Sequence, residues 1–247
     1  MKCFGFCILF TLTGLLSFAQ PFIHAHNDYD QPEPLTNALR NKAFSIEADV
    51  YLTSRGLLVA HDRKDLPTAK SLDSLYLQPI IELFKKNKGA ISEDSNYAPV
   101  LVIDIKDSAV AVLAELIKLL DPYRSVFDRS VNAKAVQVVI SGSRGAVSKW
   151  VSYPSYIFFD GRPKEVYDNA TLQRVAFISD SYFNYIIIQD STNSRIEQLT
   201  QKVHSMGKLL RVWGIPDNHD SWKNMRELGV DIINTDKVEE CRKYFFK

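Results

Sequence analysis

The sequence predicts an α/β fold, a single-domain (β/α)8 TIM barrel preceded by a signal peptide. Short apolar runs with the character of buried strands alternate with helical segments, and eight such runs can be counted along the chain. No glycine-rich phosphate loop follows the first run, which argues against an open dinucleotide-binding sheet. Residues 20–247 have the length of one barrel domain. We therefore expect a closed barrel.

The first nineteen residues have the features of a signal peptide. Lys2 precedes the apolar run Cys3–Phe18, and small residues just before Gln20 suit a signal peptidase. The run is shorter than the roughly 20 apolar residues of a membrane-spanning helix. We therefore expect removal of residues 1–19, no transmembrane span in the mature chain, and a secreted or periplasmic protein.

Charge and cysteine content limit the partners. The chain has 30 Lys and Arg residues and 29 Asp and Glu residues, a balance that argues against nucleic-acid binding and against strong attraction to an anionic membrane. Cys241 is the only cysteine after the predicted leader, so the barrel has no internal disulfide. We expect a monomer whose stability depends on its core.

The first half of the chain supplies three of the expected barrel strands. Each is an apolar run, and the second continues after a turn into Leu57–His61. Apolar residues at helical spacing indicate a helix in the segment that follows. The expected strands are Phe22–His26, Phe44–Thr53 and Pro99–Lys106, and the expected helices are Pro34–Lys42, Leu72–Asn87 and Ala109–Leu120.

The alternation continues to the C-terminus. Gly207 and Gly229 each follow a helical segment, at the position where glycine commonly ends a helix. The expected strands are Val136–Ser141, Tyr156–Asp160, Tyr185–Gln189, Leu209–Trp213 and Val230–Asn234, and the expected helices are Ala146–Val151, Leu172–Ile178, Arg195–Met206, Ser221–Leu228 and Val238–Phe246.

Polar residues gather where the expected strands end, and in a barrel of parallel strands these ends meet at one mouth. Glu47 and Asp49 lie two apart among apolar neighbours, so a strand points both to one buried face. Two buried carboxylates repel each other unless a positive charge lies between them. Asp104, at the centre of the third strand, needs a partner for the same reason. We favour a shared metal ion over a simple ion pair between Asp104 and Lys106.

The order of these groups resembles the phospholipase-C-like phosphodiesterase superfamily, which includes glycerophosphodiester phosphodiesterases, phosphoinositide phospholipases C and spider-venom phospholipases D. The residues that carry the resemblance are His26, Glu47-Ala48-Asp49, His61 and Asp104. The segments His24–Tyr29, Val59–Asp62 and Ser74–Pro79 resemble a branch that contains the fungal altered-inheritance-of-mitochondria proteins and many secreted bacterial proteins.

The resemblance implies a secreted, metal-dependent phosphodiesterase that acts on a small phosphodiester or a lipid headgroup. Asn27 matches the metal-ligating asparagine of the phosphoinositide phospholipases. Together with the three acids, Asn27 would complete an all-oxygen site that suits one Mg²⁺ or Ca²⁺. His26 and His61 would then be the catalytic acid and base, in either order. Asn27-Asp28 replaces the Arg-Gly of the glycerophosphodiesterases, whose arginine contacts the phosphate, and no cap-domain insertion follows His61.

Three further residues are candidates for substrate binding. Lys106 and Arg144 would neutralise phosphate oxygens in the transition state, although an arginine in this position is equally typical of a solvated loop. Trp213 offers a flat wall for the substrate or fills the barrel core. His24 shares a strand face with His26 and either orients it or caps the bottom of the barrel.

Two other functions compete with this interpretation. An amidohydrolase-type metal hydrolase needs further histidines at later strand ends, where this sequence has Asp160 and Gln189-Asp190. The second alternative is a non-catalytic secreted barrel that binds a phosphorylated headgroup or a glycan. For the favoured enzyme, the resemblance implies attack by a hydroxyl of the substrate itself, which forms a cyclic phosphate.

Overall fold

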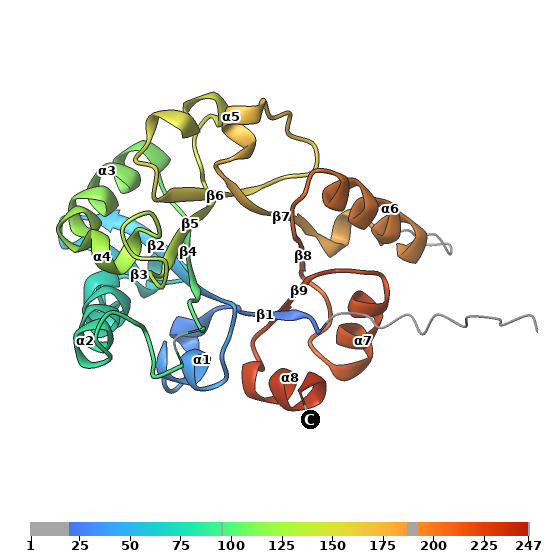
Figure 1. The fold of residues 1–247 in the computed structure, drawn as a ribbon, viewed down its shortest axis with the longest axis horizontal. Helices are drawn as coiled ribbons and strands as arrows, with labels where there is room; N and C mark the ends of the chain where they lie inside the picture. The colour runs from blue at the N-terminus through green and yellow to red at the C-terminus, as the bar shows by residue number, and fades with distance from the viewer. Residues whose placement is uncertain (1–19, 95, 187–191, 247) are drawn as a thin grey trace, which may run out of the picture.

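The computed structural model describes residues 20–94, 96–186 and 192–246, which form a closed barrel of eight parallel strands inside a ring of helices (Figure 1). The predicted fold class is therefore confirmed. The predicted signal peptide, residues 1–19, lies outside the described residues. Within the described part of the chain, no helix has both the length and the apolar character needed to cross a membrane.

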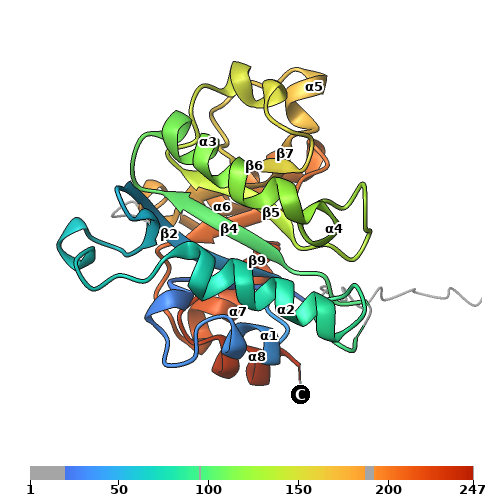
Figure 2. The ribbon, with the colours of Figure 1, turned by 90° about the vertical axis from the view of Figure 1, so that its left-hand side faces the viewer.

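The barrel closes because β1 pairs in parallel with both β2 and β9. The other neighbouring barrel strands also pair in parallel. An additional strand, β3 (Gly56–Val59), pairs antiparallel with the end of β2, and the segment after it projects from one end of the barrel (Figure 2). The barrel strands are β1 (Phe22–Ala25), β2 (Ser45–Thr53), β4 (Val100–Ile105), β5 (Gln137–Gly142), β6 (Ile157–Gly161), β7 (Val175–Ser181), β8 (Leu210–Trp213) and β9 (Ile232–Thr235).

The helices pack their apolar faces against the outside of the barrel. In α3, residues at helical spacing such as Val112, Leu113 and Leu116 are fully buried. The helices are α1 (Thr36–Arg40), α2 (Gln78–Lys86), α3 (Ala109–Leu120), α4 (Arg124–Phe127), α5 (Asn169–Leu172), α6 (Thr192–Ser205), α7 (His219–Glu227) and α8 (Val238–Phe245). Short 3₁₀ turns occupy Asp28–Asp30, Arg63–Asp65, Asp121–Tyr123, Val147–Ser152 and Tyr182–Asn184, and a π turn over Asp73–Leu77 leads into α2.

The sixth barrel strand differs from the prediction. The helix expected over Leu172–Ile178 is wrong, because α5 ends at Leu172 and the next residues form β7. The β7 segment contains β-branched and aromatic residues and is almost entirely buried, which favours a strand. The strand expected over Tyr185–Gln189 is not present in its described residues, and Gln189 and Asp190 lie outside the described part of the chain.

Side chains that point into the barrel change character along the strands. Toward the N-terminal strand ends, the interior holds an apolar cluster of Val100, Val102, Val139, Phe177 and Ile232, none more than 1% exposed. Residues two apart on a strand share a face, so the next interior positions are occupied by polar groups: Asp104 after Val102, Ser141 after Val139, Ser179 after Phe177 and Asn234 after Ile232. This polar layer lies beneath the mouth of the barrel.

Candidate active site

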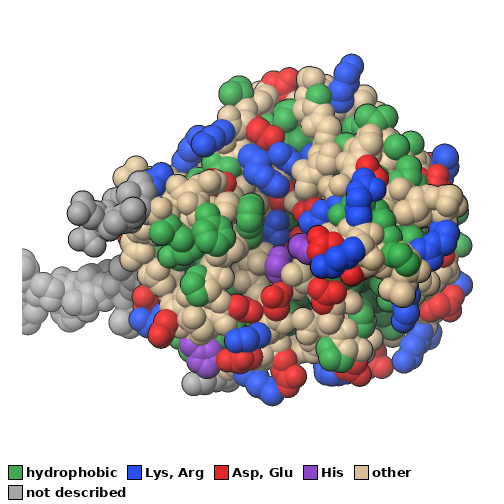
Figure 3. All heavy atoms as spheres, turned by 180° about the vertical axis from the view of Figure 1, so that it is seen from behind, with side chains coloured by type: hydrophobic (Ala, Val, Ile, Leu, Met, Phe, Trp, Pro, Cys, Tyr) green, Lys and Arg blue, Asp and Glu red, His purple; other side chains and the backbone are tan. Residues whose placement is uncertain are grey.

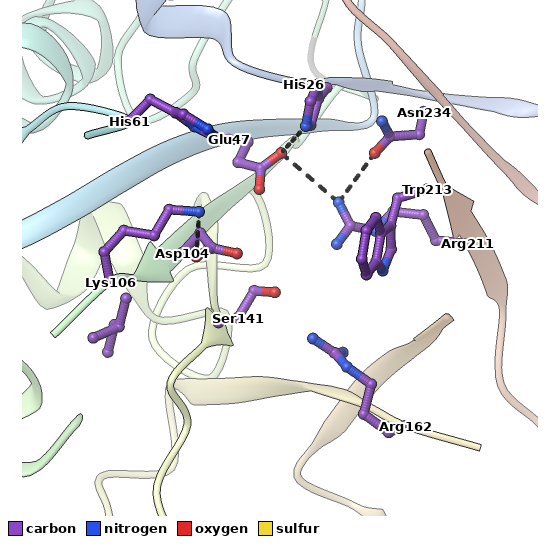
Figure 4. Close-up of a pocket in the computed structure, with 12 residues that line it drawn as sticks. His26, Glu47, His61, Asp104, Lys106, Ser141, Arg162, Arg211, Trp213 and Asn234 are labelled. Carbon is purple, nitrogen blue, oxygen red and sulfur yellow. Dashed lines mark hydrogen bonds and ion pairs between the residues drawn. The ribbon is translucent and has the colours of Figure 1, made fainter. Parts of the chain in front are cut away.

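A cavity of about 420 Å³ opens at the C-terminal ends of the barrel strands. The strands β2, β4, β5, β8 and β9, and residues that follow β1, β3, β4 and β6, supply its lining. Figure 3 shows histidine, acidic and basic side chains gathered around a hollow near the middle of one face. Figure 4 shows the side chains that point into the cavity.

Three carboxylates converge at one side of this cavity. Glu47 and Asp49 come from β2, and the backbone register pairs Asp49 directly with Asp104 of β4. One oxygen from each carboxylate lies within 4.8 Å of the others. The side chains of Glu47, Asp49 and Asp104 are only 6%, 1% and 14% exposed. The structure thus brings together the three predicted acidic ligands.

The charge around these acids fits a divalent cation. Lys106 Nζ lies 3.0 Å from Asp49 Oδ2 and 2.9 Å from Asp104 Oδ1. Burial and the charge of Glu47 still raise the pKa of Asp49, although Lys106 acts to lower it. Asp49 Oδ1 is buried and has no hydrogen-bond partner among the described residues. One ammonium therefore leaves negative charge and a buried oxygen unsatisfied, and a hard cation with oxygen ligands would satisfy both.

His26 and Asp236 form a pair at the edge of the cavity. His26 Nδ1 lies 2.7 Å from Asp236 Oδ1, and His26 Nε2 lies 4.0 Å from Glu47 Oε2. Burial alone would lower the pKa of His26, but the hydrogen bond to Asp236 and the charge of Glu47 raise it. A carboxylate on Nδ1 orients the ring and leaves Nε2 available for proton transfer.

His61 has an equivalent arrangement on the other side of the acids. Its Nδ1 lies 3.1 Å from Asp49 Oδ2, and its side chain is 58% exposed. The main-chain oxygen of His61 accepts a hydrogen bond from the Tyr51 hydroxyl at 3.1 Å, which fixes the start of the loop after β3. Both predicted catalytic histidines therefore line the cavity and contact a carboxylate through Nδ1.

Asn27 reaches the acids through a tyrosine. Asn27 adopts a left-handed conformation with φ of 45° after β1. The Tyr29 hydroxyl lies 3.0 Å from Asn27 Oδ1 and 2.8 Å from Asp49 Oδ2. Burial and the charge of Asp49 raise the pKa of Tyr29, so its hydroxyl stays protonated and acts as a donor. Sequence reasoning missed Tyr29, which occupies the space between the predicted ligand Asn27 and the carboxylates.

Two residues of the polar layer hold Glu47 from below. His24 Nε2 lies 2.9 Å from Glu47 Oε2, and Arg211 Nη1 lies 2.6 Å from the same His24 nitrogen. Burial and the charge of Arg211 lower the pKa of His24 to about 4, so the ring is neutral at pH 7. Burial would raise the pKa of Glu47, but the hydrogen bond with His24 and the charge of Arg211 lower it. His24 therefore positions a metal-ligand candidate in the barrel interior and does not cap the barrel bottom.

Arg211 connects several strands across the barrel interior. Its guanidinium contacts Ser179 Oγ at 2.9 Å, Asp160 Oδ2 at 3.1 Å and Asn234 Oδ1 at 3.3 Å, in addition to His24. Its side chain is 4% exposed. Sequence reasoning missed this residue, although its position two before Trp213 in a barrel strand places both on the inner face.

The structure places a different arginine at the cavity from the one predicted. Arg144 lies outside the lining, because it forms two hydrogen bonds with Glu165 at 3.0 and 2.9 Å and stacks over Trp150. Arg162, just after β6, lines the cavity instead. Asp160 Oδ2 lies 2.9 Å from Arg162 Nη1. Figure 4 shows the Arg162 side chain pointing into the cavity. The structure therefore does not place Arg144 in the cavity, as the prediction requires, and the arginine that lines the cavity after β6 is Arg162.

The remaining predicted substrate residues lie in the cavity. Lys106 and Trp213 both line it, and Trp213 is 38% exposed, so this ring is a cavity wall and does not fill the barrel core. Gly142, at the end of β5, also lines the cavity with φ of 64°. A Cβ atom at Gly142 would lie 2.3 Å from Asp104 Oδ1, so only glycine leaves room for this carboxylate.

The described residues form a closed parallel TIM barrel with three acids and two histidines at its mouth, the arrangement that the resemblance to phosphodiesterase barrels predicts. The chain belongs to the family described as the AIM6-like phosphodiesterase domain, whose sequence profile matches residues 17–160. The predicted resemblance is therefore confirmed.

Related proteins that match most of this chain carry names that agree with this family. The chain is 28% identical to altered inheritance of mitochondria protein 6 of Eremothecium gossypii, over 90% of this chain and 69% of that protein. It is 24% identical to the homologous protein of Arthroderma benhamiae, over 90% of this chain and 83% of that protein.

Solved structures show the same fold at lower sequence identity. A glycerophosphodiester phosphodiesterase from Parabacteroides distasonis is 16% identical, with a TM-score of 0.59 over 92% of this chain and 97% of that chain. A glycerophosphodiester phosphodiesterase from Agrobacterium tumefaciens is also 16% identical, with a TM-score of 0.53 over 91% of this chain and 100% of that chain. At this identity the similarity shows the fold alone.

Proposed function

We propose that this protein is a secreted, metal-dependent phosphodiesterase that cleaves a glycerophosphodiester or a phospholipid headgroup by histidine acid–base catalysis. The proposal rests on one arrangement: three carboxylates that approach within 4.8 Å, and two histidines beside them that each contact a carboxylate through Nδ1. An acid cluster alone would suit a structural ion. The two oriented imidazoles add the groups that move protons in phosphodiester cleavage.

The charges in the cavity match a phosphate diester. The three acids outnumber Lys106 by two charges, which one Mg²⁺ or Ca²⁺ would neutralise. On the opposite side, Arg162 and Arg211 share the single carboxylate of Asp160, which leaves one positive charge. A phosphate diester carries one negative charge, so the loaded cavity is complementary to it.

Each residue has a defined part in the reaction. Glu47, Asp49 and Asp104 would hold the cation, with Asn27 adjacent through Tyr29. The bound cation would polarise the phosphate and screen its negative charge. Lys106 and Arg162 would bind the non-bridging phosphate oxygens, and Trp213 would cover one face of the alcohol arm. One histidine takes the proton of the attacking hydroxyl, and the other protonates the leaving oxygen.

Hydrolysis of bis(p-nitrophenyl) phosphate tests this function. We expect turnover with Mg²⁺ or Ca²⁺, loss of turnover after EDTA, and recovery when the metal is returned. The His26→Gln and His61→Gln variants should each lose at least about a hundredfold in rate while retaining metal binding. A folded, metal-binding protein that cleaves no phosphodiester would instead be a binding barrel.

A further inference from the structure

A second cavity adjoins His61, and none of the three acids lines it. It has a volume of about 440 Å³ and lies between the loop after β1 and the segment that follows β3. His61 lines both this cavity and the one with the carboxylates, so the two cavities meet at this residue. We call this second cavity the side groove and define its walls by Tyr29, Gln31, Pro34, Thr68 and Leu75.

The first wall of the side groove is held in place by a buried carboxylate. Asp28 is 1% exposed, and its Oδ2 accepts hydrogen bonds from the Leu35 N–H at 2.6 Å and from the Tyr76 hydroxyl at 2.8 Å. These bonds fix both ends of the loop that carries Gln31 and Pro34. Since the anchor is internal to the protein, this wall is formed before any ligand arrives.

The second wall is held by backbone pairing. The Val59 N–H donates to Lys70 O at 2.9 Å, and Leu58 forms a bridge with Ser71. Within the loop between them, the Thr68 N–H donates to Asp65 O at 3.2 Å. The chain therefore leaves β3 and returns to the same place, and the loop forms a stable side to the groove.

The groove is suited to a polar occupant. Gln31, Thr68 and Lys70 offer hydrogen-bonding groups along its walls, and Asp30 and Asp65 also line it. Two carboxylates against one ammonium disfavour a further anion, and the polar lining disfavours a fatty chain. A small polar alcohol has the chemistry that matches these walls.

We propose that the side groove binds the leaving alcohol arm of the phosphodiester, and that this arm is a small polar alcohol. The inference rests on the proposed function. With phosphate at the acids and one arm against Trp213, the other arm must leave the phosphorus in another direction, and the groove past His61 provides it. This geometry assigns His61 as the acid and His26 as the base.

The reaction then balances as follows. A hydroxyl of the arm beside Trp213 attacks phosphorus, and its proton passes to His26. The bond from phosphorus to the oxygen of the other arm breaks, and His61 gives that oxygen a proton. The products are a cyclic phosphodiester and a free alcohol, which departs through the side groove.

The test fills the groove without touching the first cavity. Glycerophosphoethanolamine and glycerophosphomethanol share the glycerol arm and differ in the size of the leaving alcohol. We expect Thr68→Trp to lower kcat/KM for glycerophosphoethanolamine by about tenfold or more and to change it less than about twofold for glycerophosphomethanol. Gln31→Trp, from the opposite wall, should do the same.

Ser155→Trp is the control, because this exposed residue precedes β6 at the other end of the barrel. It should leave both substrates unaffected, and thermal unfolding would verify that all variants are folded. If both groove variants affect the two substrates equally, or affect neither, the side groove does not bind the leaving alcohol. An unsubstituted protein that cleaves neither substrate would overturn the proposed function, and the groove assignment with it.

Discussion

At the scale of single residues, the geometry of the cavity depends on side chains that each contact more than one polar partner. Asp49 Oδ2 lies within hydrogen-bonding distance of Tyr29, His61 and Lys106, while its other oxygen is buried without a partner among the described residues. A substitution at Asp49 should therefore affect the candidate metal site, the orientation of His61 and the position of Lys106 together.

Asp49→Asn should remove the response of the protein to metal. A ligand that binds only the folded state stabilises it by about 2.7 kcal/mol at a hundredfold excess over Kd. We expect the unsubstituted protein to gain thermal stability with Mg²⁺ or Ca²⁺, and the variant to lose both this gain and its activity. Asp107→Asn is the control, because Asp107 pairs with Arg63 outside the acid cluster. An unchanged thermal shift in Asp49→Asn would show that the cation binds elsewhere.

Substitutions of Arg162 and Arg144 should have different effects, the first on substrate binding and the second on the stability of the fold. Arg162→Met should lower kcat/KM by about tenfold to a hundredfold, because a charged hydrogen bond to phosphate is worth about 1.5–3 kcal/mol. Arg144→Met breaks the two-bonded pair with Glu165 and should lower the free energy of unfolding by about 1–3 kcal/mol. Steady-state kinetics and urea unfolding at one temperature would distinguish them. The reverse pattern would restore Arg144 as the substrate residue.

At the scale of elements, β4 and β5 approach each other so closely at their ends that a side chain has no room. Gly142 lies opposite Ile105 in this parallel pair, and its hypothetical Cβ would be 2.6 Å from the Ile105 main-chain oxygen. Because backbone cannot move aside as a flexible side chain can, the strands themselves define the position of Asp104.

Gly142→Ala should damage the metal site through the backbone. Gly145 has nearly the same φ, 69° against 64°, but its nearest neighbour would lie at 3.6 Å. Both alanine variants should lose about 1–2 kcal/mol from the left-handed conformation. Only Gly142→Ala should also weaken metal binding, which calorimetry would measure. Equal metal affinities in the two variants would mean that the Asp104 carboxylate adjusts without cost.

At the scale of the whole molecule, the barrel brings the two histidines to one cavity from opposite flanks of the acids. His26 follows β1 and is held by Asp236 from the end of β9, whereas His61 follows β3 and is held by Asp49. The pairing of β1 with β9, which closes the barrel, is therefore needed to bring His26 and His61 to the same cavity.

The resemblance to phospholipase-C-like phosphodiesterases predicts cleavage by a neighbouring hydroxyl of the substrate, and two histidines in one cavity are compatible with it. Oriented intramolecular attack can be worth about 7–11 kcal/mol. Glycerophosphodiesters with a free hydroxyl beside the phosphate should therefore give a cyclic phosphate, and analogues with that hydroxyl methylated should remain uncleaved. Phosphorus NMR would identify the products. Equal turnover of the methylated analogue would show that water is the nucleophile, and the barrel and the metal site would stand.

The sequence predicted most of the barrel because apolar strands and amphipathic helices are local patterns. It placed the acids correctly because residues two apart in a buried strand must share a face. The missed elements depend on distant contacts: β7 was confused with a helix because a short apolar run is compatible with either. Arg162 follows a strand in a loop, and only the position of Asp160 distinguishes it from a solvated arginine.

The ion pairs of Lys106 with Asp49 and Asp104 bear on the order of folding and metal binding. An ammonium between Asp49 and Asp104 serves as an internal counter-ion, so the chain can complete its fold before it meets any metal. Binding of the proposed cation would then be an ion exchange, in which the cation would replace Lys106 between the carboxylates and leave its ammonium free to approach the phosphate of the substrate. The same lysine would thus neutralise the carboxylates in the newly folded protein and the phosphate in the metal-loaded one.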